Sequence, residues 1–310
     1  MLSSMARARL NRVGATLFER GWLSSNNILI TGSNGPTALI DSGYCTHADQ
    51  TVDLVEAGLE GRRLELLLNT HLHSDHCGGN AALQQNHPGV HTLIPSGLAE
   101  AVRQWDTEAL SYADTGQECP RFAFDGVLRP GDSLRLGDWT WDIHGAKGHD
   151  PHAIVLFQPD NGVLISADAL WQNGFGVVFP ELEGLSAFEE VGQTLDCIED
   201  LSPAVILPGH GSAFDDVQLA LERARGRLQR FVEFPEQHLR HAHKVLIKFK
   251  LLERKSVTFQ DLLQWIQQTP YVAKAAPSEA PASERWLEEL IRDLERSRAV
   301  ERRGEMIFDL

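Results

Sequence analysis

The chain has 310 residues, of which 42% are hydrophobic and 23% charged, and its formal net charge at pH 7 is −15. This length predicts one large domain, residues 1–230, with a small second domain, residues 231–310. Residues 1–230 hold 30 acidic against 15 basic side chains, a surface that repels phosphate backbones, so the composition disfavours nucleic acid as a partner and favours a small-molecule substrate.

The N-terminal segment MLSSMARARLNRVG has arginines but lacks the apolar region that a secretory signal needs after them. No apolar run in the sequence reaches the length of a membrane span. The four cysteines follow no C-x-x-C spacing, which is typical of reduced thiols; they are Cys45, Cys77, Cys119 and Cys197. We therefore expect a cytoplasmic protein without membrane contact.

Short apolar runs near the N-terminus predict an antiparallel β-meander. Polar clusters separate these runs, which cover residues 17–18, 27–31 and 37–40. Asp41 follows the last run and opens an Asp-Ser-Gly turn. Apolar residues at helical spacing then predict a helix over residues 46–59, which ends before Gly61.

A cluster of metal-binding residue types follows the next apolar run, residues 64–68. Within six positions the sequence reads His71, His73, Asp75 and His76. Neutral imidazoles and a carboxylate suit zinc or a similar first-row ion. Because these residues alternate across a strand-to-helix turn, their side chains point to two sides. One segment could therefore serve two metal ions.

A βαβ rhythm continues beyond the cluster, with helices predicted over residues 80–85 and 96–105 around a strand at 90–95. Residues 106–126 lack clean periodicity. Alternating strands and turns then predict a second sheet. Three later strand-like runs each end shortly before one of three residues, His149, Asp168 and His210. We expect these three residues to lie at one common edge of the sheets.

The C-terminal part is predicted to be mainly helical, with a pair of short strands around Gly304. The helices are expected over residues 215–231, 237–252, 259–266 and 284–298. On the second helix, Arg240, Lys244 and Lys248 recur every four residues and form a basic stripe. If this stripe faced the metal edge, it could hold the anionic tail of a thiol cofactor or a carboxylate. The alternative is a solvated face.

The segment THLHSDHCGG resembles the signature of the metallo-β-lactamase-fold hydrolases, in particular the glyoxalase II-like branch. That resemblance implies an α/β fold, a four-layer αββα sandwich with two metals at one edge. It implies His71, His73 and His149 on the first metal. It also implies Asp75, His76 and His210 on the second metal, with Asp168 bridging. The expected cofactors are two zinc ions, with iron or manganese as alternatives.

The resemblance to this family also suggests roles for other parts of the chain. Asp41 resembles a family residue that supports the loops around the metals, while an ordinary turn is the equal alternative. His144 lies on the strand leading to His149, where it either supports a ligand or simply packs. Residues 106–126 would form a loop-rich lid. The C-terminal layout resembles a winged-helix appendage, and a homodimer is an open option.

The function expected from these residues is hydrolysis of an acyl bond, in a thioester, a lactone or a related small substrate. A metal-bridging hydroxide would attack, with Asp168 bridging the metals and Asp75 orienting the hydroxide or moving its proton. Three alternatives stay open: a phosphodiesterase or RNA endonuclease, iron-dependent redox or persulfide chemistry, and a non-catalytic DNA-binding module. The sequence does not indicate which residues contact the substrate.

Overall fold

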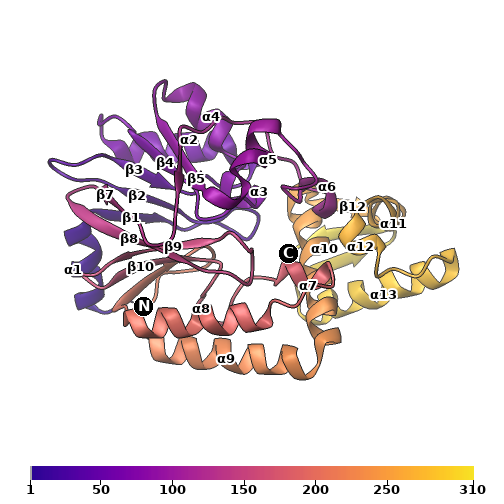
Figure 1. The fold of residues 1–310 in the computed structure, drawn as a ribbon. Coiled ribbons are helices and arrows are strands. Elements are labelled where there is room, and N and C mark those ends of the chain that lie inside the picture. The colour runs from indigo at the N-terminus through magenta and orange to yellow at the C-terminus, as the bar shows by residue number, and fades with distance from the viewer. Residues whose placement is uncertain (1) are drawn as a thin grey trace.

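The computed structural model describes residues 2–310 and shows two β-sheets packed face to face, with helices on both outer faces (Figure 1). The first sheet has six strands in chain order, from β1 to β6. Its first three strands form the predicted antiparallel meander, and β3 to β6 run parallel. The strands are β1 (Ala15–Phe18), β2 (Asn27–Ile30), β3 (Ala38–Ile40), β4 (Leu66–Leu68), β5 (His91–Pro95) and β6 (Gly126–Leu128).

The second sheet has five strands in the order β11-β10-β9-β8-β7. Its neighbours are antiparallel except for β10 and β11, which run parallel. The strands are β7 (Ser133–Leu136), β8 (Trp139–Gly145), β9 (Ile154–Gln158), β10 (Val163–Ala167) and β11 (Val205–Pro208).

The two sheets bury one apolar core between them. Ile40 and Leu68 from the first sheet and Trp141 and Leu156 from the second belong to this core, and none of the four is more than 1% exposed. Ile40 and Leu68 are also register partners on the parallel strands β3 and β4. Because both strands end at these residues, the chain leaves the core at neighbouring points of the same edge, where Asp41 and Asn69 follow.

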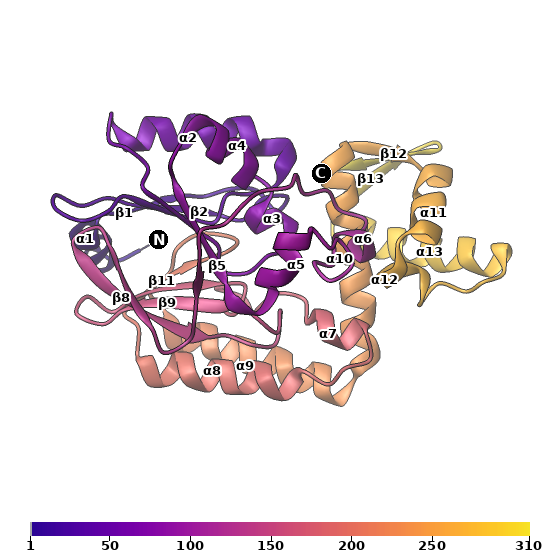
Figure 2. The same ribbon diagram turned by 45° about the horizontal axis from the view of Figure 1, so that its top comes forward.

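Helices cover the outer faces of both sheets. On the first sheet, Val55 and Leu59 of α2 (Ala48–Leu59) pack with Leu39 and Leu67, and α4 (Asn80–Asn86) joins them. On the second sheet, α8 (Phe188–Leu201) and α9 (Val217–Glu233) form the outer layer. Both views show these layers stacked in the order helix, sheet, sheet, helix (Figures 1 and 2). The predicted αββα sandwich is therefore confirmed.

Short helices complete this part of the chain. They are α1 (Ser4–Val13), α3 (Ser74–Cys77), α5 (Ala99–Gln104), α6 (Tyr112–Thr115) and α7 (Phe179–Leu182). Residues 106–126 are largely irregular, as predicted, apart from α6. Within them, Tyr112 and Phe122 are buried, and both rings pack near Trp105. These two aromatic side chains therefore stabilise the segment.

Residues beyond α9 have an apolar core of their own. Their elements are α10 (Pro235–Arg254), β12 (Ser256–Thr258), α11 (Phe259–Gln268), α12 (Pro270–Ala273), α13 (Ala280–Arg296), β13 (Val300–Arg303) and β14 (Met306–Asp309). On α13, the spacing of the buried Leu287, Leu290, Ile291 and Leu294 is that of one helix face. The strands β13 and β14 pair around Gly304, as predicted. The winged-helix likeness and the boundary at residue 231 stay predictions.

The long helix α10 lies beside the sheet edge that carries α3 (Figures 1 and 2). The rings of Tyr44 and Phe249 meet edge to face there, with centroids 5.0 Å apart. This contact joins the loop after β3 to α10. Within residues 2–310, none of the helices is both long enough and apolar enough to cross a membrane.

Candidate metal centre

Three histidines from two distant segments meet just beyond the end of β4. His71 and His73 lie in the turn before α3, and His149 lies in the loop between β8 and β9. The nitrogens His71 Nε2, His73 Nδ1 and His149 Nε2 form a triangle with sides of 3.0, 2.8 and 3.2 Å. Nitrogens about 2.0–2.1 Å from a tetrahedral zinc ion lie about 3.3 Å from one another. The triangle is therefore close to the size that one ion requires.

Hydrogen bonds on the far side of two rings determine which nitrogen faces the centre. His149 Nδ1 donates to the backbone carbonyl of Val177 at 2.5 Å. Thr70 Oγ1 donates to Asp41 Oδ2 at 2.8 Å, so it accepts from His71 Nδ1 at 3.2 Å. Because Nδ1 carries the proton in both rings, the lone pair of Nε2 points inward. A neutral imidazole needs this tautomer to bind a metal there.

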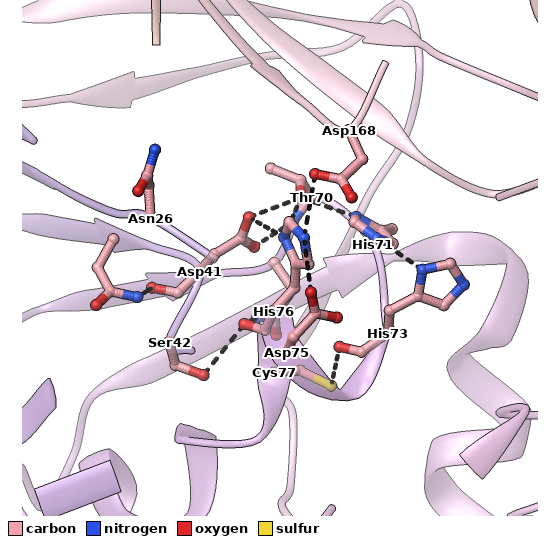
Figure 3. Close-up of polar contacts among 12 residues, drawn as sticks. Asn26, Asp41, Ser42, Thr70, His71, His73, Asp75, His76, Cys77 and Asp168 are labelled. Atoms are coloured by element: carbon pink, nitrogen blue, oxygen red, sulfur yellow. Dashed lines mark hydrogen bonds and ion pairs between the residues drawn. The ribbon is translucent and has the colours of Figure 1, made fainter. Parts of the chain in front are cut away.

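A second group of side chains lies beside the first (Figure 3). His210 Nε2 is 3.1 Å from Asp75 Oδ2, and His76 Nε2 is 3.9 Å from the same oxygen. Asp168 reaches both groups. Its Oδ1 lies 3.4 Å from His76 Nε2, whereas its Oδ2 lies 3.5 Å from His149 Nε2 and 3.8 Å from His210 Nε2.

The backbone around Asp168 accounts for this position. The pairing of β10 with β11 shifts register between Ile165 and Ala167, and Ala167 has a φ of 47°. Such irregularities turn the next side chain out of the strand alternation. Gly209 completes the approach, because a Cβ there would lie only 2.2 Å from Asp168 Oδ1 and 3.0 Å from His76 Cε1.

Asp41 supports the second group from behind (Figure 3). Its Oδ2 lies 2.7 Å from His76 Nδ1, and its Oδ1 accepts from the backbone N–H of Thr70 at 2.8 Å. Asp41 has a φ of 59°, a left-handed conformation that Asp tolerates better than most residues. These contacts orient the ring of His76 so that Nε2 faces Asp75 and Asp168.

Burial and close contact shift the pKa values of these groups. Burial acts to raise the pKa of Asp168, but the nearby His210 and His76 outweigh it and lower that pKa. Burial acts to lower the pKa of His76, but Asp41 and Asp168 outweigh it and raise that pKa well above its ordinary value. The carboxylates thus favour a positive charge at His76, and a divalent cation bound there could supply that charge in place of a proton.

The donor set fits first-row divalent ions. His76 Nε2 is buried and has no hydrogen-bond partner within residues 2–310, although it faces two carboxylates. Three groups have ligand atoms close enough together to hold one ion, namely His71–His73–His149, His71–His76–Asp168 and Asp75–His76–His210. Imidazole and carboxylate donors of this kind suit zinc, iron or manganese.

The structure brings together all seven side chains that the sequence singled out as ligands, in the two groups expected. Their roles as metal ligands stay predictions. The predicted supporting position of Asp41 agrees with its contact to His76. His144 lies on β8 with its ring 6.5 Å from that of Phe157, and no hydrogen bond in the described part of the chain joins it to a candidate ligand. This geometry is that of a histidine whose ring packs on the sheet. A supporting role of His144 for a metal ligand stays a prediction.

A cavity of about 610 Å³ opens onto this centre. Its floor is made by His73, Asp75, His149, Asp168 and His210. Opposite the floor lies one face of α10, which contributes apolar and basic side chains; they are His241, Lys244, Val245, Leu246, Lys248, Phe249 and Leu252. The sequence left two alternatives for the basic stripe, a face turned towards the metal edge or a solvated face. The structure favours the first, because Lys244 and Lys248 line the cavity.

Nearby acidic side chains form ion pairs with the cations of the basic stripe. Arg240 Nε donates to Asp293 Oδ2 at 2.8 Å, and Lys244 Nζ lies 3.7 Å from the same oxygen. Lys248 Nζ donates to Asp309 and to the backbone carbonyl of Ala299. Arg240 does not line the cavity. The stripe is thus largely neutralised within the protein.

Two tryptophans at the cavity were not found by sequence reasoning. Trp22 stacks on His210 with ring centroids 5.3 Å apart, and Trp171 meets the same ring edge-on at 5.4 Å. Trp171 Nε1 also donates to Asp168 Oδ1 at 3.2 Å. Both residues lie in irregular segments, where no periodic pattern marks a side chain as part of a site.

Comparison with known proteins places this arrangement in a family. The family model described as "Metallo-beta-lactamase superfamily" matches residues 20–210. Beta-lactamase-like protein 2 homolog of Drosophila melanogaster is 26% identical over 254 residues, which cover 74% of this chain and 75% of that protein. Among solved structures, a metallo-beta-lactamase family protein of Thermus thermophilus has a TM-score of 0.51 at 20% identity, over 96% of this chain and 99% of that one.

Similarity also extends to two kinds of named enzyme over shorter stretches. Hydroxyacylglutathione hydrolase of Erythrobacter litoralis is 27% identical over 146 residues, 47% of this chain and 48% of that enzyme. Persulfide dioxygenase ETHE1 of Bos taurus is 28% identical over 116 residues, 37% of each chain. The chain thus spans about half or less of the length of these two enzymes.

Proposed function

This chain belongs to the metallo-β-lactamase superfamily, and from that premise we propose that it is a hydrolase with two divalent metal ions that cleaves an acyl bond in a small substrate, such as a thioester or a lactone. The observation that carries the proposal is the position of Asp168. Its Oδ2 lies 3.5 Å from His149 Nε2 of the first group and 3.8 Å from His210 Nε2 of the second, at the floor of one cavity. A carboxylate within reach of both groups could contact two neighbouring metal ions at once.

The first ion would be held by His71, His73 and His149. The second would be held by Asp75, His76 and His210, and Asp168 would contact both. When bound, the ions would supply a water activated for attack near neutral pH and would polarise the substrate carbonyl. We propose zinc as the metal, since imidazoles and carboxylates are ligands that suit it.

The chain's own residues position the reactants in this proposal. Asp75 Oδ2 lies 3.1 Å from His210 Nε2 and borders the cavity, so it can orient a water or accept its proton. Trp22 and Trp171 pack against the ring of His210 and form part of the cavity wall beside it. The cavity of about 610 Å³ has the size of a small-molecule site.

A substrate panel on the purified full-length protein tests the proposal. It contains a thioester, a lactone and bis(p-nitrophenyl) phosphate, each assayed before and after treatment with a chelator. Turnover of the thioester or the lactone that disappears with the chelator is the expected result. Turnover of the phosphodiester alone would overturn the acyl-hydrolase proposal in favour of a phosphodiesterase.

Persulfide oxidation on iron is a second candidate, favoured by the similarity to persulfide dioxygenase ETHE1 over 37% of the chain. One iron on three protein ligands would account for that chemistry. The seven converging donors support two ions instead, because a single-iron site would leave several buried histidines and carboxylates without a partner. Oxygen consumption with a persulfide substrate separates the two candidates.

A further inference from the structure

We infer that Arg227, which lines the same cavity as the candidate metal centre, binds an anionic group of the substrate. The substrate would then be an amphiphilic acyl compound with one carboxylate or phosphate group. This inference rests on the proposed hydrolase function and adds the substrate class. Arg227 comes from α9, outside the basic stripe that the sequence had pointed to.

The guanidinium of Arg227 lacks an acidic partner. It lies over the rings of Phe175 and Phe231, 5.4 and 5.2 Å from their centroids, and Nη2 donates to His241 Nε2 at 2.7 Å. None of the ion pairs in the described part of the chain includes it. Only one of its five N–H groups is used by that hydrogen bond, so a planar anion could still accept two.

The charge of Arg227 persists at neutral pH. Burial, and then the neighbouring Arg230, lower its pKa to about 10, which leaves it protonated at pH 7. Its partner His241 is neutral there, because burial and then Arg227 lower the pKa of His241 to about 3. The two aromatic faces and the neutral imidazole stabilise the guanidinium without neutralising its charge, so an anion could still pair with it.

The other charged groups around the cavity do not compete for this role. Lys244 lies near Asp293, and Lys248 donates to Asp309 and to two backbone carbonyls. The carboxylates that line the cavity within residues 2–310 are Asp75 and Asp168, both at the metal floor. An anion beside Arg227 would therefore meet no neighbouring carboxylate other than these two.

The loop after β10 connects Arg227 to the metal floor. It begins at Asp168, and Gly174 lies six residues later. A Cβ on Gly174 would be 2.8 Å from Arg227 Nη1. Trp171, midway, donates to Asp168 and pairs with Gly174 through a β-bridge. The same short loop thus contains Asp168 of the metal floor and borders the guanidinium of Arg227.

Apolar side chains also line this cavity. They are Trp22, Trp171, Val177, Phe179, Val245, Leu246, Phe249, Leu252 and Leu294. A polyanion such as RNA would suit neither these walls nor the negative charge of residues 1–230. An acyl compound with an apolar body and a single anionic group matches the metal floor, the walls and Arg227 together.

Calorimetric binding of three matched compounds to the protein as purified tests the inference. Phenylbutyrate and phenylbutyl phosphate carry the anion, and phenylbutyramide is the neutral control. Arg227→Met should weaken the binding of at least one anion by about tenfold or more, as the loss of a charge-assisted hydrogen bond predicts, with the amide unchanged. Arg227→Lys should recover part of the affinity, and Arg230→Met, exposed on the same helix, should have no effect.

Each outcome has a defined meaning. A greater loss for phenylbutyrate than for phenylbutyl phosphate identifies a carboxylate as the bound group, and the reverse identifies a phosphate. Equal anion affinity in wild type and Arg227→Met overturns the inference. If Arg227→Met does not fold, a wild type that binds the amide as tightly as the anions, or more tightly, overturns it. Because binding is measured without turnover, an inactive protein that still selects the anion through Arg227 would refute only the proposed hydrolysis.

Discussion

Asp41 Oδ2 lies 2.7 Å from His76 Nδ1, and both side chains are almost entirely shielded from solvent. Asp41 directly follows β3, and the neighbouring parallel strand β4 leads into the turn and the helix α3 that carries His76. The contact directs His76 Nε2 towards Asp75 and Asp168. A carboxylate behind a histidine ligand fixes the tautomer and orientation of the ring and raises its basicity.

Asp41→Asn should weaken metal binding without unfolding the protein. Partners of this kind are worth about 10–100-fold in metal affinity or activity. Titration with a competing chelator measures the affinity, and Asp53→Asn on the exposed face of α2 is the matched control. A metal affinity equal to that of wild type would show that Asp41 contributes only to the turn that follows β3.

Asp168→Ala should leave less than a full complement of metal and should lower the turnover of an acyl substrate by at least about a hundredfold. The reason is that its carboxylate lies 3.5 Å from His149 Nε2 of the first group and 3.4 Å from His76 Nε2 of the second. Elemental analysis and initial rates on the same sample measure both effects. Full activity together with full metal content in this variant would refute the shared position of Asp168.

Trp22→Ala should raise KM for apolar substrates by about tenfold, with little change in kcat or in the free energy of unfolding. The side chain is 57% exposed and stacks on His210 at the cavity, so its loss creates no buried void. Met5→Ala is the control, because Met5 is also exposed but lies on α1 outside the cavity. An unchanged KM would exclude Trp22 from substrate contact.

Because of His238, the free energy of unfolding should decrease as the pH falls from about 6.5 to about 4. Burial, and then Arg227, lower its pKa to about 4, and its Nε2 accepts from the backbone N–H of Val178 at 3.1 Å. In that range the unfolded chain binds a proton that the native protein does not, so unfolding is favoured.

Urea unfolding at pH 7 and pH 5 measures this effect. His238→Gln keeps an acceptor for Val178 and should reduce the difference in unfolding free energy between the two pH values by about 2 kcal/mol. If the variant and wild type lose the same stability on acidification, His238 is not responsible.

Much of the fold and the candidate centre follows from local sequence pattern. His71, His73, Asp75 and His76 share one turn, and a strand-like run precedes each of His149, Asp168 and His210, so the strand ends alone predict a common edge. The register of β10 agrees with that reasoning, and its irregularity before Asp168 refines it.

Contacts between distant segments could not be predicted in the same way. Arg227 reaches the cavity only because α9 packs across the second sheet and meets α10 at His241. Trp22 reaches His210 because the loop before β2 crosses the sheet edge. The basic stripe shows the converse: the spacing of Lys244 and Lys248 was visible in the sequence, but the partners that neutralise them, Asp293 and Asp309, come from the C-terminal end.

Metal content of the purified full-length protein, measured by elemental analysis beside thioester hydrolysis, tests the central claim most directly. The seven converging donors predict about two divalent ions per chain, and hydrolysis that is lost with a chelator and restored by the metal. About one iron per chain with no hydrolysis of thioesters or lactones would contradict the claim and would indicate redox chemistry at the same residues.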